Sequence, residues 1–170
     1  VLPYIDMLLV SFDSAKAERH DEIRGKEGLF DRAVAGIRKA RSFYPGLPIQ
    51  INTCVQKGIS EEVEDLIALA QNLDVRISFD VITEFRNGEE GSKFTETDTG
   101  LDAEELSDVC SHLIRRKRGG APILNSEEYF QYFVDKRPGY ACHHPKFCLS
   151  IDGQGNVEDC LDLDHPIANI

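Results

Sequence analysis

Three strand-and-helix units in succession constrain the fold of this chain more than any other feature. Apolar runs with the length of strands lie at residues 6–12, 49–55 and 75–82. A pattern of helical period follows the first run at residues 28–44, and a second helix, with Ser60 as its N-cap, follows the next run. Strands and helices that alternate in this way predict parallel strands with right-handed crossovers. The sequence therefore predicts an α/β fold.

The chain is organised differently after the third strand. Residues 84–100 are polar and predict a loop, and a helix capped by Asp102 follows them. A linker at residues 119–122 leads to a short helix that Asn125 or Ser126 caps. The last part predicts a hairpin whose arms, residues 148–151 and 156–160, flank a turn. Three strand-and-helix units are too few for a closed barrel or a complete doubly wound sheet, so we expect a piece of a longer protein.

The composition of the chain limits the kinds of partner that it can bind. The net charge of −11 argues against binding of nucleic acid through a general basic surface. The basic run at residues 115–118 is expected to end a helix, where cations suit the helix dipole. No apolar run is long enough to span a membrane, and the start lacks the pattern of a signal peptide. We therefore expect a cytoplasmic protein that binds neither membranes nor nucleic acid.

The first strand ends in polar side chains. Ser11 and Asp13 follow the apolar run, and α/β folds bind their ligands at the carboxyl ends of parallel strands. Ser11 and Asp13 could instead cap the next turn, and Arg24 could pair with Glu22 or Asp21. The block at residues 20–25 comes next, and its first residue, His20, is expected in a turn.

The five cysteines fall into two groups. Cys54 lies in a strand pattern and Cys110 on the apolar face of a helix, so both are expected to be small buried hydrophobic residues. Cys142, Cys148 and Cys160 cluster around the predicted hairpin. Thiolates that a hairpin brings together predict a metal site, either zinc or iron–sulfur, and the neighbouring His143 and His144 make zinc credible.

Several blocks of the sequence together resemble a known family. The blocks lie at residues 10–14, 20–25, 28–37, 49–55 and 61–66. They resemble the second half of a radical S-adenosylmethionine (SAM) barrel, from that family's fourth strand onward. Cys142 is followed by twelve residues, Gly155, four residues and Cys160, which is similar to the auxiliary-cluster segment called SPASM or twitch.

The resemblance implies that the chain is divided into three parts. Residues 1–118 would form half of a TIM-like (β/α) barrel with parallel strands, and residues 119–141 would form a linker with a short helix. Residues 142–170 would begin a small cysteine-bearing β-hairpin of the SPASM or twitch kind.

The resemblance also implies an activity. Radical SAM enzymes cleave S-adenosylmethionine reductively at a 4Fe-4S cluster and make a 5′-deoxyadenosyl radical, with electrons from a donor such as flavodoxin or ferredoxin. By position, Ser11 would hydrogen-bond SAM and Arg24 would bind its carboxylate. Asp13 would lie beside them, and Thr53 would line the same pocket.

The remaining implications concern metal ligands. Cys142 and Cys160 would hold an auxiliary cluster, and Cys148 could add a ligand. The family's CxxxCxxC loop is not in this sequence, so the segment alone is not expected to cleave SAM. Two other interpretations stay open. One is a non-catalytic α/β domain with a structural zinc on these cysteines and a histidine, and the other is an α/β ligand-binding domain whose cysteines are incidental.

Overall fold

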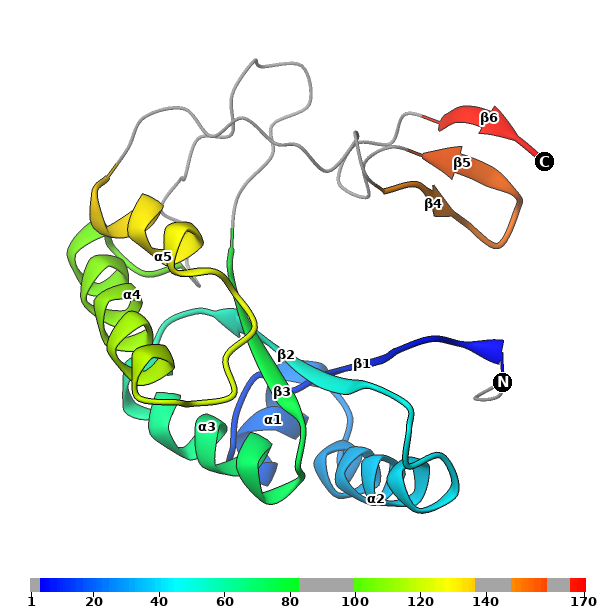
Figure 1. Ribbon diagram of the computed structural model, residues 1–170, viewed down its shortest axis with the longest axis horizontal. Coiled ribbons are helices and arrows are strands. Elements are labelled where there is room, and N and C mark those ends of the chain that lie inside the picture. Colours follow the sequence, from blue (N-terminus) through cyan, green and yellow to red (C-terminus); the bar gives the residue numbers. More distant parts are fainter. Residues whose placement is uncertain (1–3, 83–99, 137–147, 159–165) are drawn as a thin grey trace. The chain divides into compact units, whose positions relative to one another are not determined.

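A computed structural model describes residues 4–82, 100–136, 148–158 and 166–170 of the chain (Figure 1). The chain divides into two compact units. The first unit contains strands β1 to β3 and helices α1 to α5, and the second contains strands β4 to β6.

The first unit is built on a parallel sheet. Its strands are β1 (Leu8–Ser11), β2 (Ile49–Val55) and β3 (Arg76–Val81), and they lie in the order β1-β2-β3. Both pairings are parallel, with Val10 opposite Ile51 and Ile51 opposite Ile77. The predicted parallel α/β arrangement is therefore confirmed for these strands.

Helices follow each strand of the sheet. They are α1 (Ala17–Arg24), α2 (Leu29–Phe43), the 3-10 helix η2 (Ile59–Glu61), α3 (Val63–Asn72), α4 (Ala103–Arg118) and α5 (Glu127–Val134). The predicted caps of the last two are confirmed, because Asp102 accepts from the amides of Glu104 and Glu105, and Ser126 accepts from the amide of Tyr129.

One helix is missing from the sequence-based prediction, and one helix cap is predicted wrongly. The sequence did not predict α1, because this short helix buries a single side chain, that of His20, and so has no apolar stripe. Ser60 does not cap α3. It lies inside η2, and α3 begins after Glu62 without a side-chain cap.

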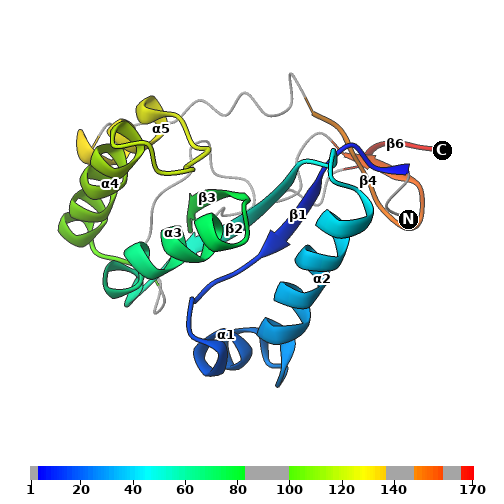
Figure 2. The same cartoon turned by 60° about the horizontal axis from the view of Figure 1, so that its bottom comes forward.

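Helices cover one face of the sheet (Figures 1 and 2). Every second residue of β2 is buried in a core that also contains Ile37 of α2, Leu66 of α3 and Leu113 of α4. The intervening residues of β2 are only half-buried. Since successive side chains of a strand point to opposite faces, the sheet has one apolar face against the helices and a second face that is polar on β2 and β3 and also carries the exposed Leu9 of β1.

A fourth parallel segment borders the sheet after α4. Ile123 forms a parallel bridge with Ile77, whose amide donates to the carbonyl of Pro122 at 2.9 Å and whose carbonyl accepts from the amide of Leu124 at 2.8 Å. The sequence predicts only a linker here. The structure shows instead that the end of this stretch extends the edge of β3.

The basic end of α4 is tied into the fold. Arg116 pairs with Glu64 at 2.9 Å, and Arg118 pairs with Glu127 at 2.7 Å. The ammonium of Lys117 donates to the carbonyl of Ile123 at 2.7 Å. The run therefore ends a helix, as expected. Of the helices in the described ranges, none combines the length and the apolar character that a membrane crossing requires.

The second unit is a small antiparallel sheet. It contains β4 (Ser150–Ile151), β5 (Asn156–Glu158) and β6 (Pro166–Asn169), and β5 pairs with both others. Asp152 closes the turn between β4 and β5 by accepting from the amides of Gln154 and Asn156. The sequence did not predict β6. Cys148 precedes β4 and is exposed, whereas Cys142 and Cys160 lie outside the described residues.

A buried carboxylate joins the turn after β1 to the start of α3. Glu62, 1% exposed, accepts from the Ser14 hydroxyl at 2.5 Å and from the Ala15 amide at 3.0 Å. Its other oxygen lies 3.0 Å from Nη1 of Arg19. Since Glu62 belongs to a region that the sequence assigned to the first turn of a helix, this tertiary role was not foreseen.

We expect Glu62→Ala to lower the free energy of unfolding by about 3 kcal/mol, because it leaves buried donors without an acceptor and a guanidinium without its counter-ion. Urea denaturation measures the change. Glu61→Ala is the matched control, since Glu61 is the exposed neighbouring residue, and it should cost less than about 0.5 kcal/mol. Equal effects of the two substitutions would contradict the buried role of Glu62.

Candidate functional site

Asp13 and Arg24 form an ion pair at the carboxyl end of β1. Oδ2 of Asp13 lies 2.6 Å from Nη2 of Arg24, and Oδ1 accepts from the main-chain amide of Cys54 at 3.2 Å. The pair therefore joins the second residue after β1, the last residue of α1 and the end of β2. Gly25 ends α1 in the left-handed conformation, at φ 64°, and the cation of Arg24 lies at the favourable end of the helix dipole.

His20 lies behind this pair in the core. It is 1% exposed, its ring stacks on that of Phe12 at a centroid distance of 5.2 Å, and its Nδ1 accepts from the main-chain amide of Asp13 at 3.3 Å. The expectation that His20 is a turn residue is therefore wrong. Burial lowers the pKa of His20 and outweighs the charge of Asp13, which raises it.

Asp21 caps the helix that follows. Its carboxylate accepts from the main-chain amides of Gly28 and Phe30 at the start of α2. The hydrogen bond from Phe30 lowers the pKa of Asp21 most, and the bond from Gly28 adds to it. Asp21 therefore binds α2, and the structure pairs Arg24 with Asp13 instead of Asp21 or Glu22.

The polar face of the sheet continues from Asp13 across β2 and β3. Cys54 is half-buried and lies opposite Asp80 in the strand register, so the prediction of a buried hydrophobic Cys54 is wrong. Burial raises the pKa of the Cys54 thiol, and Asp13 raises it further. Desolvation also raises the pKa of Asp80, against hydrogen bonds from the side chains of Asn52 and Asn125.

Cys110 follows the prediction made for it. It is fully buried on α4, and burial raises the pKa of its thiol to about 12. A thiol of this kind stays protonated and behaves as a small hydrophobic side chain.

The other two residues predicted to contact SAM lie apart from the ion pair. Ser11 is the exposed last residue of β1 and lies opposite Asn52. Thr53 is fully buried, and its hydroxyl donates to the carbonyl of Phe12 at 2.6 Å. The side chain of Thr53 therefore faces the helices, and its only hydroxyl proton is already used.

Sequence reasoning missed Asn52, Cys54 and Asp80. A signal for them exists in β2, where Gln50, Asn52 and Cys54 alternate with apolar residues and Thr53. Alternation of this kind indicates one polar face. Residues 49–55 were predicted as a strand without separation of its two faces.

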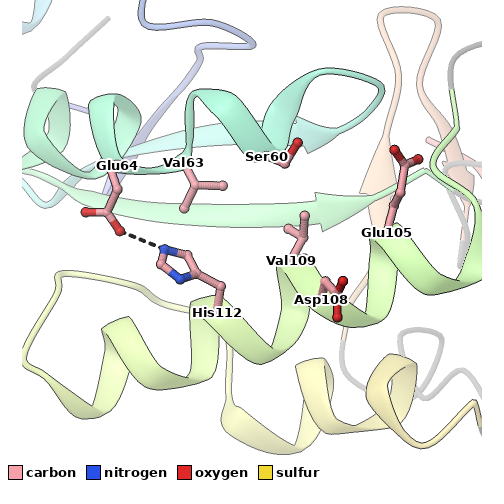
Figure 3. A pocket seen from close by; sticks show the side chains of 7 residues that line it. All are labelled: Ser60, Val63, Glu64, Glu105, Asp108, Val109 and His112. Atoms are coloured by element: carbon pink, nitrogen blue, oxygen red, sulfur yellow. Dashed lines mark hydrogen bonds and ion pairs between the residues drawn. The ribbon is translucent and has the colours of Figure 1, made fainter.

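A hollow of about 440 Å³ lies between η2, α3 and α4 (Figure 3). Glu64, Glu105 and Asp108 line it, and Oε1 of Glu64 lies 2.7 Å from Nε2 of the His112 ring. Within the part of the chain that the structure describes, no three His, Cys, Asp or Glu side chains are placed to hold a metal ion. The acidic lining therefore defines no metal site.

Curated relatives and a solved structure support the resemblance of this chain to radical SAM enzymes. The chain is 44% identical over 69 residues to the AdoMet-dependent heme synthase of Methanosarcina barkeri. It is 36% identical over 64 residues to the protein of that name from Oleidesulfovibrio alaskensis. The aligned parts are 41% and 38% of this chain, and no protein-family model matches it.

A solved structure shares the fold. The crystal structure of Streptococcus suis SuiB aligns with 95% of this chain at a TM-score of 0.58 and 14% identity. The alignments cover only 19% and 16% of the two heme synthases and 40% of the SuiB chain. This chain thus spans a small part of the proteins that it resembles.

We expect the stability of the fold to fall as the pH drops below about 6.5, the ordinary pKa of histidine, because the unfolded chain takes up the proton of His20 before the folded chain does. Above that pH, His20 is neutral in both states and its contribution is complete. Urea denaturation at pH about 7.5 and about 5.5 measures the loss.

His20→Phe keeps a ring against Phe12 and removes the titration. It should lower stability at both pH values, because the Asp13 amide loses its acceptor, but it should reduce the difference between them. Phe43→Leu is the control and should retain the full difference, since Phe43 is 67% exposed and does not titrate. A wild-type pH dependence in His20→Phe would contradict the assignment to His20.

Proposed function

We propose that this chain is a segment of a radical SAM enzyme. Residues 1–118 would form half of its TIM-like barrel, residues 119–141 a connection with a short helix, and residues 142–170 the beginning of an auxiliary-cluster hairpin of the SPASM or twitch kind. The match of 44% identity over 69 residues to an AdoMet-dependent heme synthase carries this proposal. The parallel segments with helices on one face, and the likeness to SuiB, support it.

The residues at the end of β1 fit the proposed SAM pocket. Arg24 exposes 35% of its side chain and would bind the SAM carboxylate, and Ser11 exposes a hydroxyl at the strand end. Asp13 lies beside Arg24. We leave Thr53 out of the proposed contacts, because its hydroxyl binds the carbonyl of Phe12.

The chemistry of the whole enzyme would come from SAM and a 4Fe-4S cluster, which together supply a 5′-deoxyadenosyl radical when an electron donor such as flavodoxin or ferredoxin reduces the cluster. The CxxxCxxC ligands of that cluster are not in this sequence. The 170 residues would therefore supply one wall of the SAM and substrate pocket, and they would be inactive alone. The names of both curated relatives make heme synthesis the first reaction to test in the whole protein.

Cys142, Cys148 and Cys160 would hold the auxiliary cluster. Of the three, Cys148 is described, and its exposed free thiol beside β4 suits a ligand. Thiolates from a loop and from the ends of hairpin strands can equally bind zinc. The metal that these cysteines bind therefore separates the proposal from the structural zinc domain.

We expect anaerobic reconstitution with iron and sulfide to give the chain a broad visible absorption band. The band should disappear in a variant with Cys142→Ser and Cys160→Ser, because both cluster ligands are lost. Cys110→Ser is the control and should keep the band, since Cys110 is buried on α4. Metal analysis measures iron, sulfide and zinc. Stoichiometric zinc without a visible band would favour the structural zinc domain, and no bound metal would favour a domain with incidental cysteines.

A further inference from the structure

We propose that Asp13 is a positioning residue that holds the Arg24 guanidinium in place for the carboxylate of a ligand. This inference rests on the proposed function, because SAM is the carboxylate that the family resemblance brings to Arg24. It adds a role for Asp13, for which neither the sequence nor the comparisons give one.

The ion pair is asymmetric in its exposure. The Asp13 side chain is 4% exposed, whereas the Arg24 side chain is 35% exposed. The contact joins Nη2 of Arg24 to Oδ2 of Asp13, and a guanidinium has five N–H donors. A ligand that approaches the pair from solvent therefore meets the cation first, with donors left to bind it.

Asp13 is itself held from two sides. Its Oδ1 accepts from the amide of Cys54 on β2, and its own amide donates to Nδ1 of His20 on α1. His20 is in turn fixed in the core by stacking on Phe12. The carboxylate is thus anchored to the sheet and to the helix, and it can fix the direction of the long Arg24 side chain.

The neighbouring carboxylates have other partners, which makes the pairing of Asp13 with Arg24 specific. Asp21 binds the amides at the start of α2. Glu62 binds Ser14 and the other arginine of α1, Arg19. Asp13 is therefore the carboxylate that the fold provides for Arg24.

The ligand class follows from the geometry of the cation. A guanidinium binds a planar carboxylate through parallel N–H donors, and a fixed guanidinium loses less freedom when it does so. If Coulomb interactions alone decided, a variant without the Asp13 charge would be expected to bind an anion more tightly, which is the opposite of what the positioning role predicts.

Asp13→Asn in the 170-residue chain separates these possibilities. The guanidinium proton resonances of Arg24 in NMR spectra report whether the side chain is fixed, and titrations with SAM and with decarboxylated SAM report the affinities. We expect Asp13→Asn to release the guanidinium and to weaken SAM binding about tenfold. The affinity for decarboxylated SAM should stay at its wild-type value. Glu127→Gln is the control, because it removes the carboxylate of the exposed Arg118 pair and should change neither readout.

Three results would overturn the proposal: a guanidinium that stays fixed in Asp13→Asn, SAM binding that is unchanged or tighter, and an equal loss for both ligands. Should Asp13→Asn fail to fold, Arg24→Lys takes its place in the test. It keeps the positive charge on a half-exposed side chain but removes the planar guanidinium with its parallel N–H donors. Arg24→Lys should weaken the binding of SAM and leave the binding of decarboxylated SAM unchanged. A wild-type affinity for SAM in this variant would overturn the proposal.

Acetate distinguishes this proposal from the proposed function. If acetate shifts the Arg24 resonances of the wild-type chain but not those of Asp13→Asn, while SAM shifts neither, Asp13 positions Arg24 for a carboxylate other than SAM and the proposed function is at fault. If neither acetate nor SAM shifts them, the positioning role itself is wrong.

Discussion

The parallel sheet of the first unit has helices on one face, and the arrangement of the candidate site follows from this constraint. Parallel sheets are ordinarily covered on both faces, because their strands are apolar on both. Here the buried residues of β2 alternate with half-buried polar ones, and β3 continues the alternation with half-buried Ser78 and exposed Asp80. Ser78 donates to Asn52 at 2.5 Å, so the polar side chains of this face already bind one another. Such a face is suited to contact with a ligand or with polar protein groups.

The block at residues 20–25 gives almost every polar side chain a task within the fold. His20 packs on Phe12, Asp21 caps α2, and Gly25 ends α1 with a left-handed conformation. These tasks explain the residue types and their spacing without any ligand. Arg24 differs from them, because its charge is bound on one side by Asp13 and remains open on the other. A functional interpretation of the block therefore rests on Arg24.

The elements of the fold were predictable where a single local signal decides them. Periodic apolar residues placed β2 and α2, and Asp102 and Ser126 marked the starts of α4 and α5. The helix α1 was not predictable, because it is held by the side chains of Asp13 and Glu62, which lie outside it, and has no apolar stripe.

The residues of the candidate site were also predictable only in part. Position at a strand end identified Asp13, and the family resemblance identified Arg24. Neither could show that the two bind each other, since eleven positions and one unpredicted helix separate them. Thr53 lies near the end of β2, but this position did not place its side chain in the proposed SAM pocket, because Thr53 is buried on the other face. One step along a strand moves a side chain to the opposite face, and Thr53 is adjacent to Cys54, which does lie on the polar face.

The balance of two opposing effects decides what Asp13 contributes to an anion site in a chain of net charge −11. Repulsion between Asp13 and a ligand carboxylate about 6 Å away costs about 0.7 kcal/mol at the dielectric constant of water, and about 2.8 kcal/mol at the effective value of about 20 that applies near a protein surface. Exposed charges that lie farther away than the Debye length of about 8 Å are largely screened. Fixing an arginine side chain in advance is worth up to about 2 kcal/mol of rotamer entropy. Because the repulsion and the gain are of similar size, the sign of the change in affinity on removal of the Asp13 charge reports which of the two effects dominates.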